Sequence, residues 1–141
     1  MKRPIILIGL GAVAAVAALS FYQRSALPAA GKEAAGSAIV AVEVPPLEGN
    51  ALIGKRAFEN ACATCHGENA VGQNGVAPPL VHKIYEPGHH GDASFQAAVA
   101  YGVRSHHWRF GDMPPVEGLT EGDVAMIVAY IRTLQRANGI E

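Results

Sequence analysis

Both cysteines of the chain stand in one pentapeptide, Cys62-Ala63-Thr64-Cys65-His66. The C-x-x-C-H pattern is the attachment motif for c-type haem, in which both thiols bond covalently to the porphyrin and the histidine ligates iron from the same helical turn. A disulfide, thiol exchange and half of a zinc site are the other chemistries that C-x-x-C serves. The adjoining histidine favours one covalent haem c, with Cys62 and Cys65 as the attachments and His66 as an iron ligand.

The other uses of the motif have weaker support elsewhere in the chain. In a thiol oxidoreductase the motif follows a strand of a β-α-β unit, whereas both flanks of Cys62 have a helical pattern. A zinc site needs further ligands, and the remaining histidines include no second clustered pair of ligands. These histidines are His82, His89, His90, His106 and His107. Adjacent side chains diverge, so the pairs at 89–90 and 106–107 are poor chelates, and we expect solvated loop histidines. An accessory metal site, partner contact and pH-dependent tuning are the alternatives.

Helical patterns surround the motif. Gly54, Phe58 and Cys62 recur at intervals of four, which places them along one helical face. A second helix is expected over residues 92–101, with Phe95, Ala98 and Val99 turned inward. These patterns predict an all-α domain.

The last helix has the clearest pattern. Thr120 caps its start, Asp123 occupies the capping-box position, and Asn138-Gly139 ends it. Its apolar stripe consists of Val124, Ile127, Val128, Ile131 and Leu134. We expect this stripe to form much of the core.

Over residues 50–137 these features resemble class I cytochromes c, small electron carriers with one haem. The resemblance implies about three to five helices wrapped around a covalently bound haem. It also implies that Gly54 and Phe58 meet Ile127 and Tyr130 of the last helix. The segment Ala77-Pro78-Pro79-Leu80 matches the Pro-x-Leu segment beside the haem, where the carbonyl of Pro78 would accept the ring N–H of His66.

The second iron ligand is expected at Met113, in Gly111-Asp112-Met113-Pro114-Pro115. Two prolines stiffen this loop, and the family commonly has a proline directly after its methionine ligand. The rival ligands are His106 and His107, which would give a lower reduction potential. Trp108 and Arg109 precede the loop, and by resemblance they are candidates for hydrogen bonds to the haem propionates. A core position for Trp108 and an exposed one for Arg109 are the alternatives.

The N-terminal segment has the layout of an export signal, since Lys2 and Arg3 precede an uncharged apolar run over residues 4–22. A helix of this length spans roughly 28 Å, which favours a retained anchor over a cleaved signal peptide. Either alternative places the rest of the chain on the periplasmic side of a bacterial inner membrane. We expect the signal or anchor at 1–23, an Ala/Gly/Pro-rich linker at 24–49 and a cytochrome c domain at 50–141.

The charge balance excludes one class of partner. The chain has 11 Lys+Arg and 12 Asp+Glu, and residues 47–141 carry a net charge of −3. Such a surface has no basic field for nucleic acid. We expect a monomer that docks weakly on basic redox partners.

A six-coordinate iron leaves no open site for a substrate, so we expect a one-electron carrier and not an enzyme. No Ser-His-Asp or paired-carboxylate arrangement stands out in the chain. The alternatives are a five-coordinate haem enzyme or gas binder, and a non-haem Cys/His metal-binding domain.

Overall fold

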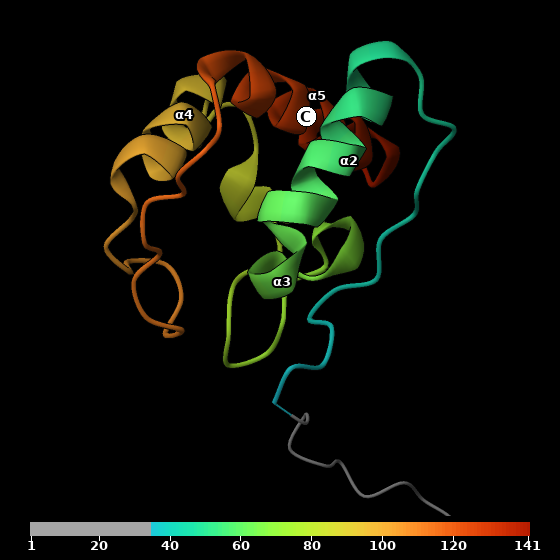
Figure 1. The fold of residues 1–141 in the computed structure, drawn as a ribbon. Helices are drawn as coiled ribbons and strands as arrows, with labels where there is room; N and C mark the ends of the chain where they lie inside the picture. Colours follow the sequence, from blue (N-terminus) through green and yellow to red (C-terminus); the bar gives the residue numbers. More distant parts are fainter. Residues whose placement is uncertain (1–34) are drawn as a thin grey trace, which may run out of the picture. The chain divides into compact units, whose positions relative to one another are not determined.

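Four α-helices and two short 3-10 helices account for the secondary structure of residues 35–141, the part of the chain that this computed structural model describes (Figure 1). The α-helices are α2 (Gly49–Ala61), α3 (Ala63–His66), α4 (Asp92–Tyr101) and α5 (Glu121–Ala137), and the 3-10 helices are η1 (Glu68–Ala70) and η2 (Lys83–Tyr85). β-Pairing within residues 35–141 is limited to isolated bridges. The all-α prediction is confirmed for these residues, whereas the apolar helix predicted over 4–22 lies outside them.

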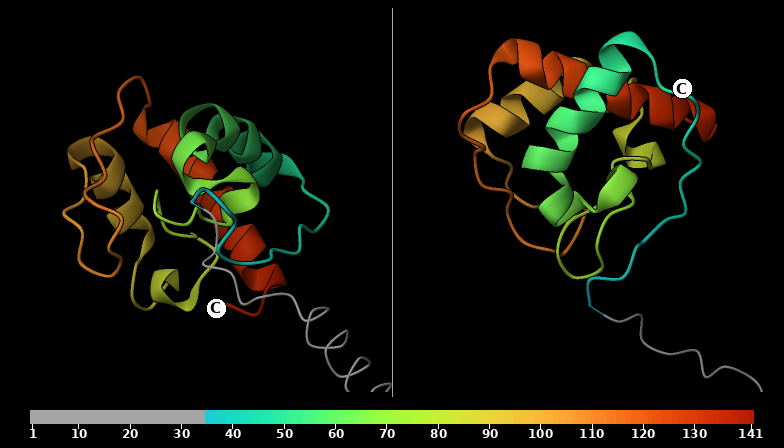
Figure 2. Two further views of the ribbon diagram at one scale, coloured as in Figure 1. Left: turned by 90° about the horizontal axis from the view of Figure 1, so that it is seen from below. Right: turned by 45° about the vertical axis from the view of Figure 1, so that its right-hand side comes forward.

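The centre of the fold is the crossing of α2 and α5, which both views in Figure 2 show. At Gly54 the two backbones approach so closely that an added Cβ would stand 1.8 Å from the carbonyl oxygen of Met126. One turn later, the rings of Phe58 and Tyr130 pack with their centroids 5.6 Å apart. The predicted meeting of the first and last helices is therefore confirmed, and it fixes the direction in which α2 enters the cysteine motif.

Helix α5 contributes a large share of the buried apolar side chains of the core. The predicted capping box is present, because Thr120 Oγ1 accepts the N–H of Asp123 at 3.2 Å while the carboxylate of Asp123 accepts the N–H of Thr120 at 2.9 Å. All five residues of the predicted apolar stripe are buried. Helix α4 also has the predicted bounds.

The packed part of the chain begins earlier than the predicted boundary at residue 50. The N–H groups of Ile39 and Val40 both donate to the carbonyl of Val71. Glu43 exchanges two hydrogen bonds of 2.9 Å with the side chain of Asn138. The later part of the predicted linker is therefore attached to the domain. None of the helices in residues 35–141 is long and apolar enough to cross a bilayer.

Candidate functional site

The cysteine motif lies on a tight helical turn that continues α2. Cys62 forms the boundary between α2 and α3, and its carbonyl accepts the N–H of His66 at 2.9 Å. Both thiols are free, with Cys62 half-buried and Cys65 exposed. Burial and the neighbouring Cys65 raise the pKa of the Cys62 thiol to about 11. This shift is opposite to the lowered pKa on which thiol exchange depends.

The imidazole of His66 is buried, and its orientation is set by one hydrogen bond. Its Nδ1 lies 2.8 Å from the carbonyl oxygen of Pro78, which can only accept, so Nδ1 carries the proton. The lone pair is therefore on Nε2. Burial lowers the pKa of His66, and the bond to Pro78 opposes that change. A neutral imidazole with a fixed tautomer is the form that ligates a metal ion.

The segment that supplies Pro78 is held close to the motif by backbone contacts. Leu80 N–H donates to the carbonyl of Ala70 at 2.9 Å, and Gly72 has a φ of +73°. A Cβ on Gly72 would lie 2.4 Å from Pro79 N, so the close approach depends on glycine. Leu80 is buried and faces the same cavity as His66. Pro78 thus accepts the ring N–H of His66 as the resemblance implies, and Leu80 lines the same cavity.

A cavity of about 510 Å³ opens beside His66, which is a volume typical of cofactor sites. Cys62 and Cys65 line it from the α2–α3 side. Most of the other lining is apolar and comes from the segment 76–80, α4, the connection between α4 and α5, and α5 itself. The apolar lining residues include Ala77, Leu80, Phe95, Val99, Phe110, Val116, Val124, Ile127 and Ile131.

Met113 lines this cavity from the connection between α4 and α5, the orange segment in Figure 1. It forms an antiparallel bridge with Val103, in which each backbone N–H donates to the partner's carbonyl at 2.9 Å. Gly102 makes the bridge possible, since a Cβ there would lie 2.5 Å from the carbonyl oxygen of Met113. The bridge fixes the backbone of Met113 at the cavity wall.

Trp108 and Arg109 have different places in the structure. Trp108 lines the cavity, and its indole Nε1 is buried. The indole N–H is directed toward the hydroxyl of Tyr85, and this interaction opposes part of the burial that raises the pKa of Tyr85 to about 12. Arg109 is exposed and is not part of the cavity lining, which is the alternative position expected for it, and its role beside the haem propionates stays a prediction.

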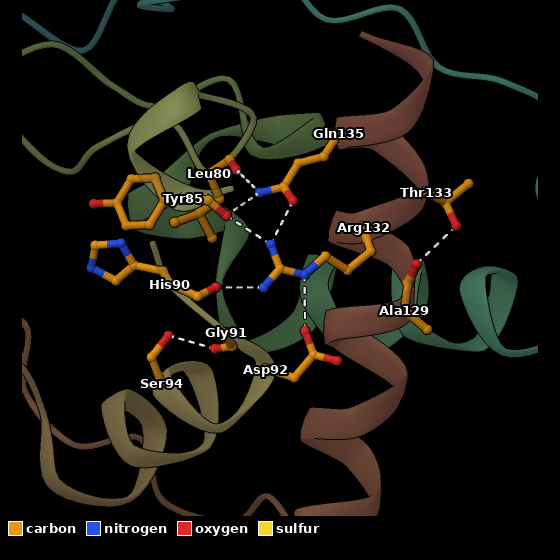
Figure 3. Close-up of polar contacts among 10 residues, drawn as sticks. All are labelled: Leu80, Tyr85, His90, Gly91, Asp92, Ser94, Ala129, Arg132, Thr133 and Gln135. Atoms are coloured by element: carbon orange, nitrogen blue, oxygen red, sulfur yellow. Dashed lines mark hydrogen bonds and ion pairs between the residues drawn. The ribbon is translucent and has the colours of Figure 1, made fainter. Parts of the chain in front are cut away.

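Sequence reasoning missed a polar network on α5 (Figure 3). The buried guanidinium of Arg132 donates to Asp92 Oδ1 at 2.9 Å, to the carbonyl of Tyr85 at 2.7 Å, to Gln135 Oε1 at 2.6 Å, and to the carbonyl of His90. The amide of Gln135 donates to the carbonyl of Leu80 at 2.8 Å. The only sequence signal was two polar residues beside an apolar stripe, a pattern that also fits an exposed helical face.

These features fit a covalently held haem. An apolar cavity beside two free thiols and a neutral imidazole offers the attachment points, one axial ligand and a low-dielectric surrounding. The buried indole N–H of Trp108 in the cavity wall is a donor that a propionate oxygen would accept.

Comparison with known proteins agrees with this fit. The family model of cytochrome c matches residues 51–135, a range that includes the cysteine motif and Met113. No curated protein and no solved structure matches the chain. The chain belongs to the cytochrome c family and its cofactor is covalently bound haem c.

Proposed function

We propose that this protein carries single electrons between redox partners, with His66 and Met113 as the axial ligands of its haem iron. When bound, haem c supplies one-electron chemistry between its ferric and ferrous states. The observation that carries the proposal is that His66 and Met113 line one cavity, each with its backbone or ring fixed by hydrogen bonds.

The surrounding residues support this ligand pair in two ways. The bond from His66 Nδ1 to Pro78 strengthens the imidazole as a donor and maintains its orientation. Among the described residues that line the cavity, Met113 provides the only thioether. A Met/His pair gives a higher reduction potential than two histidines. With both axial positions filled, the iron has no open site, which favours a carrier over an enzyme.

The test is the replacement of Met113 by Leu, which removes the sulfur with little change in side-chain volume. We expect the oxidised variant to lose the weak far-red sulfur-to-iron absorption band, to bind cyanide more readily and to have a lower potential. Met126→Leu is the matched control, since Met126 is absent from the cavity lining. An unchanged band and potential in Met113→Leu would exclude this ligand.

The rival axial ligands require their own variants. His106 and His107 also line the cavity. If His106→Gln or His107→Gln loses the native ligation while Met113→Leu keeps it, the second axial ligand is that histidine and not Met113. A wild-type spectrum that already shows an open coordination position would favour a gas binder or haem enzyme.

We further propose that the partners are proteins with basic docking surfaces. Residues 47–141 have a net charge of −3, and the haem propionates add negative charge. Contacts of this kind are weak and depend on salt. The second-order rate of electron transfer to a basic partner should fall as ionic strength rises, and a rate independent of salt would contradict this proposal.

The proposed location is the periplasmic face of a bacterial inner membrane, with residues 1–23 as signal or anchor. It rests on the charged and apolar pattern of this segment, which lies outside the described residues. Membrane fractionation combined with N-terminal sequencing tests it, because a retained anchor predicts an intact N-terminus in the membrane fraction.

A further inference from the structure

The fold brings together histidines from two segments that are distant in the sequence. His89 and His90 lie between η2 and α4, whereas His107 lies in the connection between α4 and α5. One ring nitrogen from each of the three lies within 4.8 Å of the others. The rings of adjacent histidines also lie close together, with centroids 4.7 Å apart for His89 and His90 and 4.2 Å apart for His106 and His107, so the expectation that adjacent histidines diverge is wrong here. With Met113 as the second axial ligand, the proposed electron transfer uses none of these three histidines.

We propose that His89, His90 and His107 form a binding site for one divalent transition-metal ion of the Zn²⁺ class, separate from the haem iron. Zn²⁺ and Cu²⁺ are the common divalent ions that prefer imidazole nitrogen, and the cluster contains no carboxylate that would favour Mg²⁺ or Ca²⁺. Three protein ligands leave a fourth position for water, which is the arrangement of an open zinc site.

The spacing of the nitrogens supports a tetrahedral ion. Zn–N bonds of about 2.0–2.1 Å at a tetrahedral angle place two ligand nitrogens about 3.3–3.4 Å apart. The Nε2 atoms of His89 and His107 are 3.3 Å apart. The three atoms lie within 4.8 Å of one another, which exceeds the tetrahedral value by at most about 1.4 Å. Rotation of the exposed side chains of His89 and His107 closes this difference.

His90 has the supporting contacts typical of a metal ligand. Its Nδ1 donates to the carbonyl of Ile84 at 2.6 Å, which leaves the Nε2 lone pair available. Its own carbonyl accepts a hydrogen bond from Arg132, so the backbone is attached to α5 (Figure 3). His90 is therefore held in position before an ion binds, and the exposed side chains of His89 and His107 supply the other two ligands.

His106 is the natural control because it is adjacent to the site without belonging to it. Its ring packs against His107 with centroids 4.2 Å apart, and its Nδ1 donates to the carbonyl of Arg104 at 2.8 Å. It is not a member of the three-nitrogen group. A substitution there leaves the proposed ligands in place.

The proposed ion joins two walls of the haem cavity. His90 and His107 both line the cavity, and the segment that contains His107 leads into Met113. A bound ion would tie this segment to the start of α4. We therefore expect Zn²⁺ to raise the Tm of the holoprotein, since a ligand that binds only the folded state stabilises it.

The experiment is calorimetric titration of Zn²⁺ into the full-chain holoprotein, without an affinity tag and after removal of metals by a chelator. We expect one ion per chain. His89→Gln and His107→Gln should each weaken binding by more than about tenfold, because even outer contacts of a metal site change affinity by 10–100-fold. His106→Gln should retain the wild-type affinity. The haem absorption spectrum of each variant, recorded in parallel, shows that the protein is folded and its haem intact.

Electron paramagnetic resonance of bound Cu²⁺ gives an independent readout, with hyperfine coupling to three imidazole nitrogens expected in the wild type and to two in His107→Gln. Wild-type affinity in both His89→Gln and His107→Gln, or the absence of 1:1 binding, would overturn the proposal. An equal loss in His106→Gln would overturn the assigned ligand set. The haem spectrum reports the axial ligands separately from the Zn²⁺ affinity. Weakened Zn²⁺ binding with an unchanged haem spectrum in His107→Gln assigns this residue to the proposed site, whereas a changed haem spectrum bears on the electron-carrier proposal.

Discussion

The replacement of Gly54 by Ala tests the helix crossing on which the haem cavity depends. The new Cβ would lie 1.8 Å from the carbonyl oxygen and 2.4 Å from the carbonyl carbon of Met126, and real Cβ atoms essentially never approach such atoms closer than 3.0 Å. Because the obstacle is helical backbone, α2 and α5 must separate by about 1.2 Å at this point. The substitution thus perturbs the packing of both helices and not only of one side chain.

The expected cost follows from three contributions. Overpacking of a close contact destabilises by about 1–3 kcal/mol. Separation also weakens the contact of Phe58 with Tyr130, and aromatic pairs contribute about 0.5–1.5 kcal/mol beyond their burial. The higher helix propensity of Ala offsets about 1 kcal/mol. The net effect is a loss of about 2 kcal/mol, which lowers the Tm of a domain of this size by about 8–16 °C.

The assay is thermal unfolding of the holoprotein, followed by circular dichroism and by the haem absorption. Gly122→Ala in α5 is the matched control, because a Cβ there meets only Thr120 Oγ1 at 3.6 Å, an ordinary contact. The same chemical change should therefore be neutral or stabilising at Gly122 and destabilising at Gly54. Equal or higher stability of Gly54→Ala would refute the close crossing.

Two further predictions concern α5. Arg132→Met should destabilise the protein in denaturant unfolding by roughly 2–6 kcal/mol, because the carbonyl of His90 and Oε1 of Gln135 each lose a donor, at about 1–3 kcal/mol apiece. Arg136→Met on the exposed side of α5 should change stability by less than about 0.5 kcal/mol. Hydrogen bonds from Thr120 lower the pKa of the Asp123 carboxyl group below its ordinary value of 3.8. The ionised carboxylate therefore stabilises the folded state fully above pH 3.8, and this contribution is lost as the pH falls through the lowered pKa. Asp123→Asn should consequently have a lower Tm than the wild type at pH 7, with a difference that shrinks in acid, and a difference independent of pH would contradict this reasoning.

Local patterns were sufficient to predict much of the fold. The bounds of α4 and the capping box of α5 follow from residues within one or two helical turns of one another, so short-range hydrogen bonds and apolar periodicity determine them. The cysteine motif is equally local, since its spacing places both thiols and the imidazole of His66 on one turn. The bond from His66 to Pro78, twelve residues away, was expected from the family resemblance and is present.

The sequence by itself determined the cofactor chemistry and the helices, because each depends on neighbours along the chain. Only the tertiary structure decided which way Trp108 and Arg109 face, where the polar side chain of Arg132 is buried, and that residues before 50 pack on the domain. It also brought His89 and His107 together across 18 residues. Contacts of this kind depend on how α4 and its flanking segments dock on α5, and that docking is set by the packing of the whole core and not by any local pattern.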